Sequence, residues 1–173
     1  LVRPFTGPVE ATVVVPVSKS FPNRALVCAA LARGESTLEG VLESDDTEAM
    51  FGCLDALGIA VEHDPLLHRA VVRGTGGASR RSMAALDVRQ SGTTARFGTP
   101  MVARGHGRFT IAGPSRMRAR PRSDLVGPIL NLGGAIQSCD GGRLPLPGPA
   151  KRNPGRTVPT PGARPQQLLH GAA

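Results

Sequence analysis

The chain repeats one order of segments, and this repeat restricts its fold more than any other feature. Arg24 is followed by a helix pattern of small and apolar residues that ends at residues 32–34, Ala-Arg-Gly. Arg96 is followed by a similar pattern that ends at residues 103–105, again Ala-Arg-Gly. Because the copies lie about 70 residues apart and alternate helix with strand, we expect similar α/β or α+β units that pack together.

The next segments of each copy also correspond. The strand pattern STLEGVL at residues 36–42 matches RFTIAG at residues 108–113. A helix pattern within residues 44–58 leads into Ile59, as a helix predicted over residues 123–132 leads into GGAI. The match of these segments in the same order supports the repeat.

Local signals place further elements in the first copy. ATVVVP at residues 11–16 predicts a strand buried on both faces, and a helix over residues 23–33 is closed by Gly34. IAVE at 59–62 and RAVVR at 69–73 predict strands joined by a polar turn.

The helix within residues 44–58 has its own start and stop signals. Ser44 or Asp45 caps its start, Asp45 with Glu48 resembles a capping box, and Gly58 ends it. The face expected to be buried consists of Ala49, Met50, Cys53, Leu54 and Leu57.

Composition narrows the classes of ligand. With 40% hydrophobic residues, five Phe and neither Trp nor Tyr, the core must come from Val, Leu, Ile and Ala, and an aromatic surface for stacking nucleic acid is not expected. The formal charge is +8, with 21 basic and 13 acidic residues. Arginine suits carboxylates and phosphates, so anionic ligands fit, although coding composition or solubility explains unsupported arginines equally well.

The cysteines Cys28, Cys53 and Cys139 are widely spaced, with no CxxC pair. This spacing argues against a zinc site and a disulfide framework, and favours a reducing, cytoplasmic location. Cys28 and Cys53 lie in apolar helical stretches, where we expect buried small hydrophobes. There is no signal peptide pattern, and no apolar run approaches the ~20 residues of a membrane span. The start at Leu1 suggests a piece of a longer protein.

The character of the chain changes after its central part. From Pro145 on it holds seven of the 16 prolines, four basic residues and no acidic one, so we expect neither a strand ladder nor a helix there. We therefore divide the chain into a folded part, residues 1–148, and a Pro/Arg-rich tail, residues 149–173. We expect this tail to be disordered, and to be either a basic interaction arm, such as one for nucleic acid, or a truncated or frame-shifted end.

Two helix starts carry groups that suit an anion. Ser18-Lys19-Ser20 precedes the first helix, and Arg24 lies one turn further on. The unpaired N–H groups of a helix start attract phosphate or carboxylate, and these side chains add charge-assisted bonds. As composition alone, a Ser-Lys-Ser turn is commonplace.

The second copy has QSGTTAR at the corresponding place. Gly92 permits close approach to the backbone, and Thr93 and Thr94 offer hydroxyl groups. GPSRMRARP then brings Arg116, Arg118 and Arg120 into one loop, although such a charge run is usually solvated.

Three stretches follow one another along the chain. They are residues 18–59, QSGTTARF at 90–97, and SRMRARP at 115–121 with SDLVGPILNLGG at 123–134. In this order the chain resembles, over residues 16–147, the N-terminal part of the 3-phosphoshikimate 1-carboxyvinyltransferase (EPSP synthase) family. The sister family, UDP-N-acetylglucosamine enolpyruvyl transferase, shares the fold and is the alternative. Lys19-Ser20, the SDDT segment and the RMRARP loop favour the shikimate family.

The resemblance implies an α+β (α/β) fold of repeated βαβαββ units, the inside-out α/β domain of enolpyruvyl transferases, incomplete here. It implies transfer of the enolpyruvyl group of phosphoenolpyruvate to the 5-hydroxyl of shikimate 3-phosphate through a tetrahedral intermediate. The substrates are these small molecules, without metal, other cofactor, nucleic acid or membrane, and the full-length enzyme is monomeric.

The resemblance also implies residue roles. Lys19 touches both substrates, Ser20 and Arg24 hold shikimate 3-phosphate, and Gly92 and Arg116 hold phosphoenolpyruvate. The positions that shape the same loop, with less defined roles, are Gln90, Ser91, Thr93 and Arg96.

Two departures limit the expected activity. The family has glycine where this chain has Val17, and valine resists the backbone angles that glycine permits beside Lys19. The family's acid and base groups for proton transfer lie in a domain beyond this stretch, so no catalytic residue is assigned and the chain alone is expected to be inactive. A non-catalytic anion-binding remnant is the other alternative.

Overall fold

The computed structural model of the chain describes residues 20–77, 79–103, 107–134 and 136, the backbone of residues 146–150, and residues 7, 10, 12 and 18 singly. Its elements, in chain order, are α1 (Ser20–Leu31), β1 (Arg33–Glu39), α2 (Asp45–Ala56), β2 (Val61–Asp64), β3 (Arg69–Thr75), β4 (Met83–Asp87), α3 (Gly92–Ala103), β5 (Gly107–Ala112), α4 (Ser115–Arg118), α5 (Ser123–Asn131) and β6 (Leu146–Ala150).

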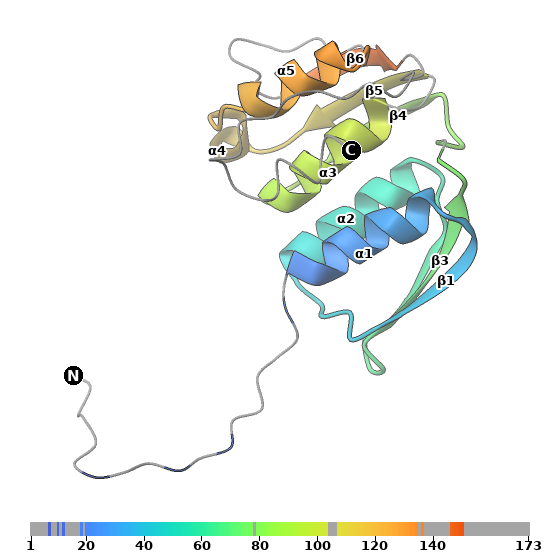
Figure 1. Ribbon diagram of the computed structural model, residues 1–173, viewed down its shortest axis with the longest axis vertical. Coiled ribbons are helices and arrows are strands. Elements are labelled where there is room, and N and C mark those ends of the chain that lie inside the picture. The colour runs from blue at the N-terminus through green and yellow to red at the C-terminus, as the bar shows by residue number, and fades with distance from the viewer. Residues whose placement is uncertain are drawn as a thin grey trace.

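The strands form two three-stranded sheets, with orders β1-β3-β2 and β4-β5-β6. The first sheet is antiparallel throughout. In the second, β4 runs parallel to β5, and β6 runs antiparallel to it. Helices α1 and α2 lie side by side next to α3, between the two sheets (Figure 1). The described fold is therefore mixed α and β, as predicted.

The predicted repeat is confirmed in the order and pairing of the elements. α1, β1, α2 and β3 correspond to α3, β5, α5 and β6, and α1 and α3 have 12 residues each. β1 pairs antiparallel with β3 as β5 does with β6. The strand predicted at residues 11–16 lies outside the described residues, apart from Thr12.

The starts of α1, β1 and β2 differ from the predicted boundaries. The helix begins at Ser20 rather than residue 23, and the strand begins at Arg33 rather than residue 36. Gly34 adopts φ +87, so the backbone reverses within the strand's first residues and not after a separate loop. β2 also starts two residues later than predicted, and Ile59 is buried ahead of it.

Helix α2 confirms the predicted apolar face and Ser44, one of the two predicted caps, but corrects the predicted capping box. The residues of that face, Ala49, Met50, Cys53, Leu54 and Leu57, are all buried. The capping box joins Ser44 to Thr47, not Asp45 to Glu48. Ser44 is the extended residue before the helix, whereas Asp45 is already its first helical residue, so only Ser44 can accept from the third N–H group.

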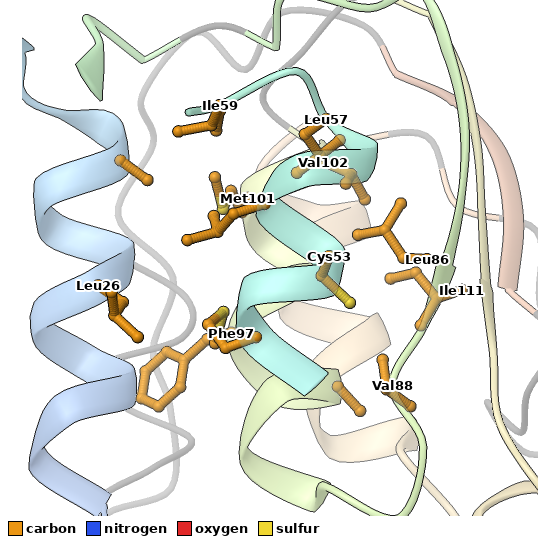
Figure 2. Packing of buried hydrophobic residues seen from close by; sticks show 14 of the residues in the cluster. Leu26, Cys53, Leu57, Ile59, Leu86, Val88, Phe97, Met101, Val102 and Ile111 are labelled. Carbon is orange, nitrogen blue, oxygen red and sulfur yellow. The ribbon is translucent and has the colours of Figure 1, made fainter. Parts of the chain in front are cut away.

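The buried side chains between the helices and the sheets form one main cluster (Figure 2). Aliphatic residues dominate it, as predicted, with two phenylalanines, Phe97 and Phe109, added. Cys53 lies within it, but Cys28 is exposed, contrary to the prediction. Leu26, Ala29 and Ala30 take the buried side of α1, which leaves Cys28 facing away from the core.

The prediction that no ladder forms after Pro145 is wrong for β6, which extends past the proposed boundary at residue 148. β6 is an edge strand, so only one of its edges must be paired. Pro147 and Pro149 are two residues apart, and their nitrogen atoms therefore share one edge. The missing N–H groups cost no ladder bond if that edge is the unpaired one.

Candidate anion-binding site

The start of α3 is fixed by a chain of short-range hydrogen bonds. Asp87 Oδ1 accepts from the Arg89 N–H at 2.9 Å, and Arg89 adopts a left-handed φ of 46. Buried Ser91 caps the helix, because its Oγ accepts from the Thr94 N–H at 3.0 Å. Gln90, between these residues, is exposed. The loop therefore presents the first N–H groups of α3 in a defined direction.

Gly92 is the first residue of α3, and a guanidinium group lies against it. The Arg120 Nη1 atom is 3.3 Å from the position that a β-carbon on Gly92 would occupy. Any larger residue would have to displace Arg120, whereas glycine leaves the helix start open beside a positive charge. Thr93, the next residue, is half-buried.

Arg122 is buried, whereas Arg120 is exposed, and it was not among the predicted site residues. Its side chain is 3% exposed, and its Nη1 donates to the Met117 carbonyl at 3.3 Å. Burial lowers the pKa of its guanidinium, and the positive charges of Arg96 and Arg120 lower this pKa further. Three arginines therefore act on one another electrostatically near the start of α3.

Arg24 and Arg96 occupy the same position in the two copies, the fifth residue of α1 and of α3. Each has a buried side-chain nitrogen, Arg24 Nε and Arg96 Nη1, with no hydrogen-bond partner among the described residues. A buried donor without a partner costs free energy, so an anion that accepts from these groups would be favoured.

The starts of the two copies meet at α2. Asn23 Nδ2 donates to the Asp46 carbonyl at 3.3 Å, and Thr94 Oγ1 donates to the same oxygen at 3.1 Å. Figure 1 shows the starts of α1, α2 and α3 close together on one side of the molecule. The helix starts predicted to bind anions are therefore neighbours.

The remaining predicted site residues are Ser20, Arg116 and Lys19, with Val17 beside Lys19. Ser20 is the first residue of α1 and is half-buried. Arg116 is exposed on α4, and among the described residues the side chain that lies against Gly92 is that of Arg120. Lys19 and Val17 lie outside the described residues.

Other kinds of site find no support in the described part of the chain. It holds no group of three His, Cys, Asp or Glu side chains placed to ligate a metal ion. None of its helices has the length and apolar character needed to cross a membrane.

Taken together, the fold and this geometry define a mixed α and β protein of repeated units, with a candidate anion-binding site at neighbouring helix starts. A comparison with known protein families identifies the family of this mixed α and β protein. The chain belongs to the EPSP synthase (3-phosphoshikimate 1-carboxyvinyltransferase) family, whose profile matches residues 5–159.

Curated relatives include 3-phosphoshikimate 1-carboxyvinyltransferases from bacteria and plants. That of Nostoc punctiforme is 46% identical over 134 residues, which is 78% of this chain and 31% of the relative. That of Trichormus variabilis is 48% identical over 126 residues, covering 73% of this chain and 30% of the relative. The chloroplastic protein of Petunia hybrida is 38% identical over 144 residues, which is 79% of this chain and 28% of the relative. This chain thus spans less than a third of their length.

Solved structures agree on the fold. An EPSP synthase from Acinetobacter baumannii superposes with a TM-score of 0.81 at 24% identity, over 92% of this chain and 36% of that one. At this identity the match supports the fold alone.

Proposed function

We propose that this chain supplies the part of a 3-phosphoshikimate 1-carboxyvinyltransferase that holds its two anionic substrates. The reaction moves the enolpyruvyl group of phosphoenolpyruvate to the 5-hydroxyl of shikimate 3-phosphate and releases inorganic phosphate. Family membership and the names of the relatives favour this reaction over that of the sister family.

The observation that carries the proposal is the approach of Arg120 to Gly92 at the start of α3. Two polyanions repel each other, so an enzyme that joins them needs fixed positive groups at the place of reaction. The N–H groups of a helix start and a guanidinium provide such positive groups without reorganisation, and the glycine leaves them accessible. The unpartnered nitrogen of Arg96 supports the same assignment.

The assignment of residues follows the two copies. In this proposal, Ser20 and Arg24 at the start of α1 hold shikimate 3-phosphate, and Gly92 with Arg116 holds phosphoenolpyruvate. Lys19 contacts both substrates. The supporting residues of the loop are Gln90, Ser91, Thr93 and Arg96.

We add Arg120 to this set because of its position beside Gly92. Arg122 acts on the same site through its charge, since its guanidinium is buried and the charges of Arg96 and Arg120 lower its pKa. The binding domain in this proposal extends through Ala150, because β6 pairs with β5.

Proton transfer requires a positioned acid and base, which we assign to the portion of the relatives that this chain does not span. The 173 residues alone should then bind substrates without turnover. The proposal includes a cytoplasmic location and a monomeric full-length enzyme.

Isothermal titration calorimetry of the 173-residue chain with each substrate tests the binding. Arg24→Ala should weaken binding of shikimate 3-phosphate at least tenfold, about 1.4 kcal/mol, because it removes a charge-assisted bond. Arg33→Ala is the matched control, since Arg33 is exposed beyond the opposite end of α1. A parent chain that gives no heat of binding with phosphoenolpyruvate and none with shikimate 3-phosphate would refute the proposal.

A second candidate is an anion-binding protein without catalysis, which the unpartnered buried nitrogen atoms of Arg24 and Arg96 favour. Adding the C-terminal remainder of the Nostoc punctiforme relative discriminates between the two. Phosphate release in the mixture, abolished by Arg24→Ala, supports the enzyme. Binding by the chain without phosphate release in the mixture supports the non-catalytic protein.

A further inference from the structure

We propose that Asn23 and Thr94 are positioning residues that set the spacing of the two substrate-binding helix starts through one backbone oxygen. Both donate to the Asp46 carbonyl, Asn23 from α1 at 3.3 Å and Thr94 from α3 at 3.1 Å. Asp46 is the second residue of α2. The carbonyl of a third helix thus joins the two copies of the repeat.

We call the two bonds from Asn23 and Thr94 to the Asp46 carbonyl the junction, and both of its donors are buried. Asn23 and Thr94 are both 0% exposed, so no water replaces the carbonyl if either helix shifts. A buried donor that loses its acceptor carries a desolvation penalty, which opposes such a shift. Asn23 Oδ1 has no partner among the described residues, so the bond to Asp46 fixes the orientation of this amide.

The donors lie next to the groups that would hold the substrates. Asn23 immediately precedes Arg24, and Thr94 is two residues before Arg96 and two after Gly92. A change in the junction would therefore move the α1 groups relative to the α3 groups while each helix keeps its own set. This inference rests on the proposed function for the identity of its ligands.

The expected effect is on the coupling between ligands. Each helix start can bind its own anion without the junction, so affinities for single ligands change little. The benefit that one bound ligand gives the other depends on a fixed distance between their sites. Loss of the junction should abolish that benefit.

The variant Thr94→Val removes the hydroxyl at nearly constant volume, and Thr94→Ser retains it. Thr99→Val is the matched control, because Thr99 lies on the same helix, is buried, and donates within α3 to the Ala95 carbonyl at 2.7 Å. Asn23→Leu provides an independent variant from the α1 side if Thr94→Val does not fold.

Calorimetry measures the phosphoenolpyruvate affinity of each variant with and without saturating shikimate 3-phosphate. The parent, Thr94→Ser and Thr99→Val should show a gain of about tenfold with the second ligand. Thr94→Val and Asn23→Leu should show a ratio near unity, with single-ligand affinities within about threefold of the parent. A purely structural role would leave the ratio intact, and an unchanged ratio overturns the inference.

Amide hydrogen exchange without ligand separates this result from failure of the proposed function. Thr94→Val and Asn23→Leu should speed exchange in the first turns of α1 and α3 and leave β3 unchanged. A parent chain that binds neither substrate refutes the proposed function, and the exchange data then decide the junction alone. Unchanged exchange at both helix starts overturns the inference whatever the binding result.

Discussion

The guanidinium of Arg120 is in near contact with Gly92, with Nη1 3.3 Å from the point where a β-carbon would lie. The two residues come from separate elements, Gly92 from the start of α3 and Arg120 from the turn between α4 and α5. Their approach turns an ordinary helix start into one with a side-chain cation at its open end. The geometry leaves room for an anion but little for a larger residue at position 92.

Gly92→Ala should therefore weaken binding of phosphoenolpyruvate without unfolding the chain. Gly92 has no left-handed φ, so alanine adds no backbone strain. Its methyl group would push Arg120 by a few tenths of an ångström and occupy the approach to the first N–H groups. We expect a loss of affinity of about tenfold, or 1.4 kcal/mol, by calorimetry. Gly127→Ala is the control, since a β-carbon there meets nothing within 4 Å.

Arg122→Met should separate stability from binding. The substitution replaces a buried cation, whose pKa is lowered by burial and by Arg96 and Arg120, with an apolar side chain of similar length. Removal of desolvation and of like-charge repulsion should raise the free energy of unfolding by about 1 kcal/mol. Anion affinity should fall in the same variant because the positive potential at the site decreases.

Urea unfolding followed by circular dichroism, with phosphate as the test anion, measures both effects. Arg118→Met is the control, since Arg118 is exposed on α4 and its loss should change stability little. A clear loss of stability in Arg122→Met would contradict the repulsion argument and show that its bond to Met117 dominates.

The sequence predicted the elements whose signals are local. The apolar spacing in α2 identified its buried face, and Gly58 marked its end with φ +76. The hydroxyl groups at the two helix starts, and the glycine at the second, likewise needed no tertiary information. Physical rules about caps and periodicity act within a few residues, so they can be read directly.

Features that depend on distant contacts were missed. β4 has only Leu86 as a large buried residue, and its strand form depends on parallel pairing with β5. Arg122 gave no signal, because arginine is normally exposed and its burial results from its surroundings in the folded chain. Arg120 was predicted only as one of three arginines in a basic loop, and only the folded chain brings it to Gly92.

Cys53 should make stability fall at alkaline pH. Burial raises the pKa of its thiol from 9.0 to about 12, and the negative charge of Asp87 adds to the effect. In the unfolded chain the thiol ionises from pH 9, whereas the folded chain keeps its proton. The contribution is therefore complete below pH 9 and is lost toward pH 12, by about 1.4 kcal/mol per pH unit.

The difference in unfolding free energy between the parent and Cys53→Ser, measured across this pH range, isolates the contribution. Cys28→Ser should show no such trend, because Cys28 is exposed. Iodoacetamide should also label Cys28 in the native chain and Cys53 only after denaturation. Rapid native labelling of Cys53 would mean that the thiol is not shielded as described.

Two glycine substitutions should change stability in opposite directions. A β-carbon on Gly74 in β3 would lie 2.5 Å from the Ala29 carbonyl oxygen and closer still to that of Ala32. Both oxygens belong to backbone, at the end of α1 and just beyond it, and cannot rotate away, so Gly74→Ala must separate α1 from the sheet. We expect a loss of about 3 kcal/mol.

Gly52 is exposed within α2, and a β-carbon there meets nothing within 4 Å. Gly52→Ala should therefore raise the unfolding free energy by about 1 kcal/mol through helix propensity alone. Urea unfolding of both variants beside the parent gives the two values under one set of conditions. A Gly74→Ala variant as stable as the parent would mean that α1 does not pack against β3 as closely as the backbone positions require.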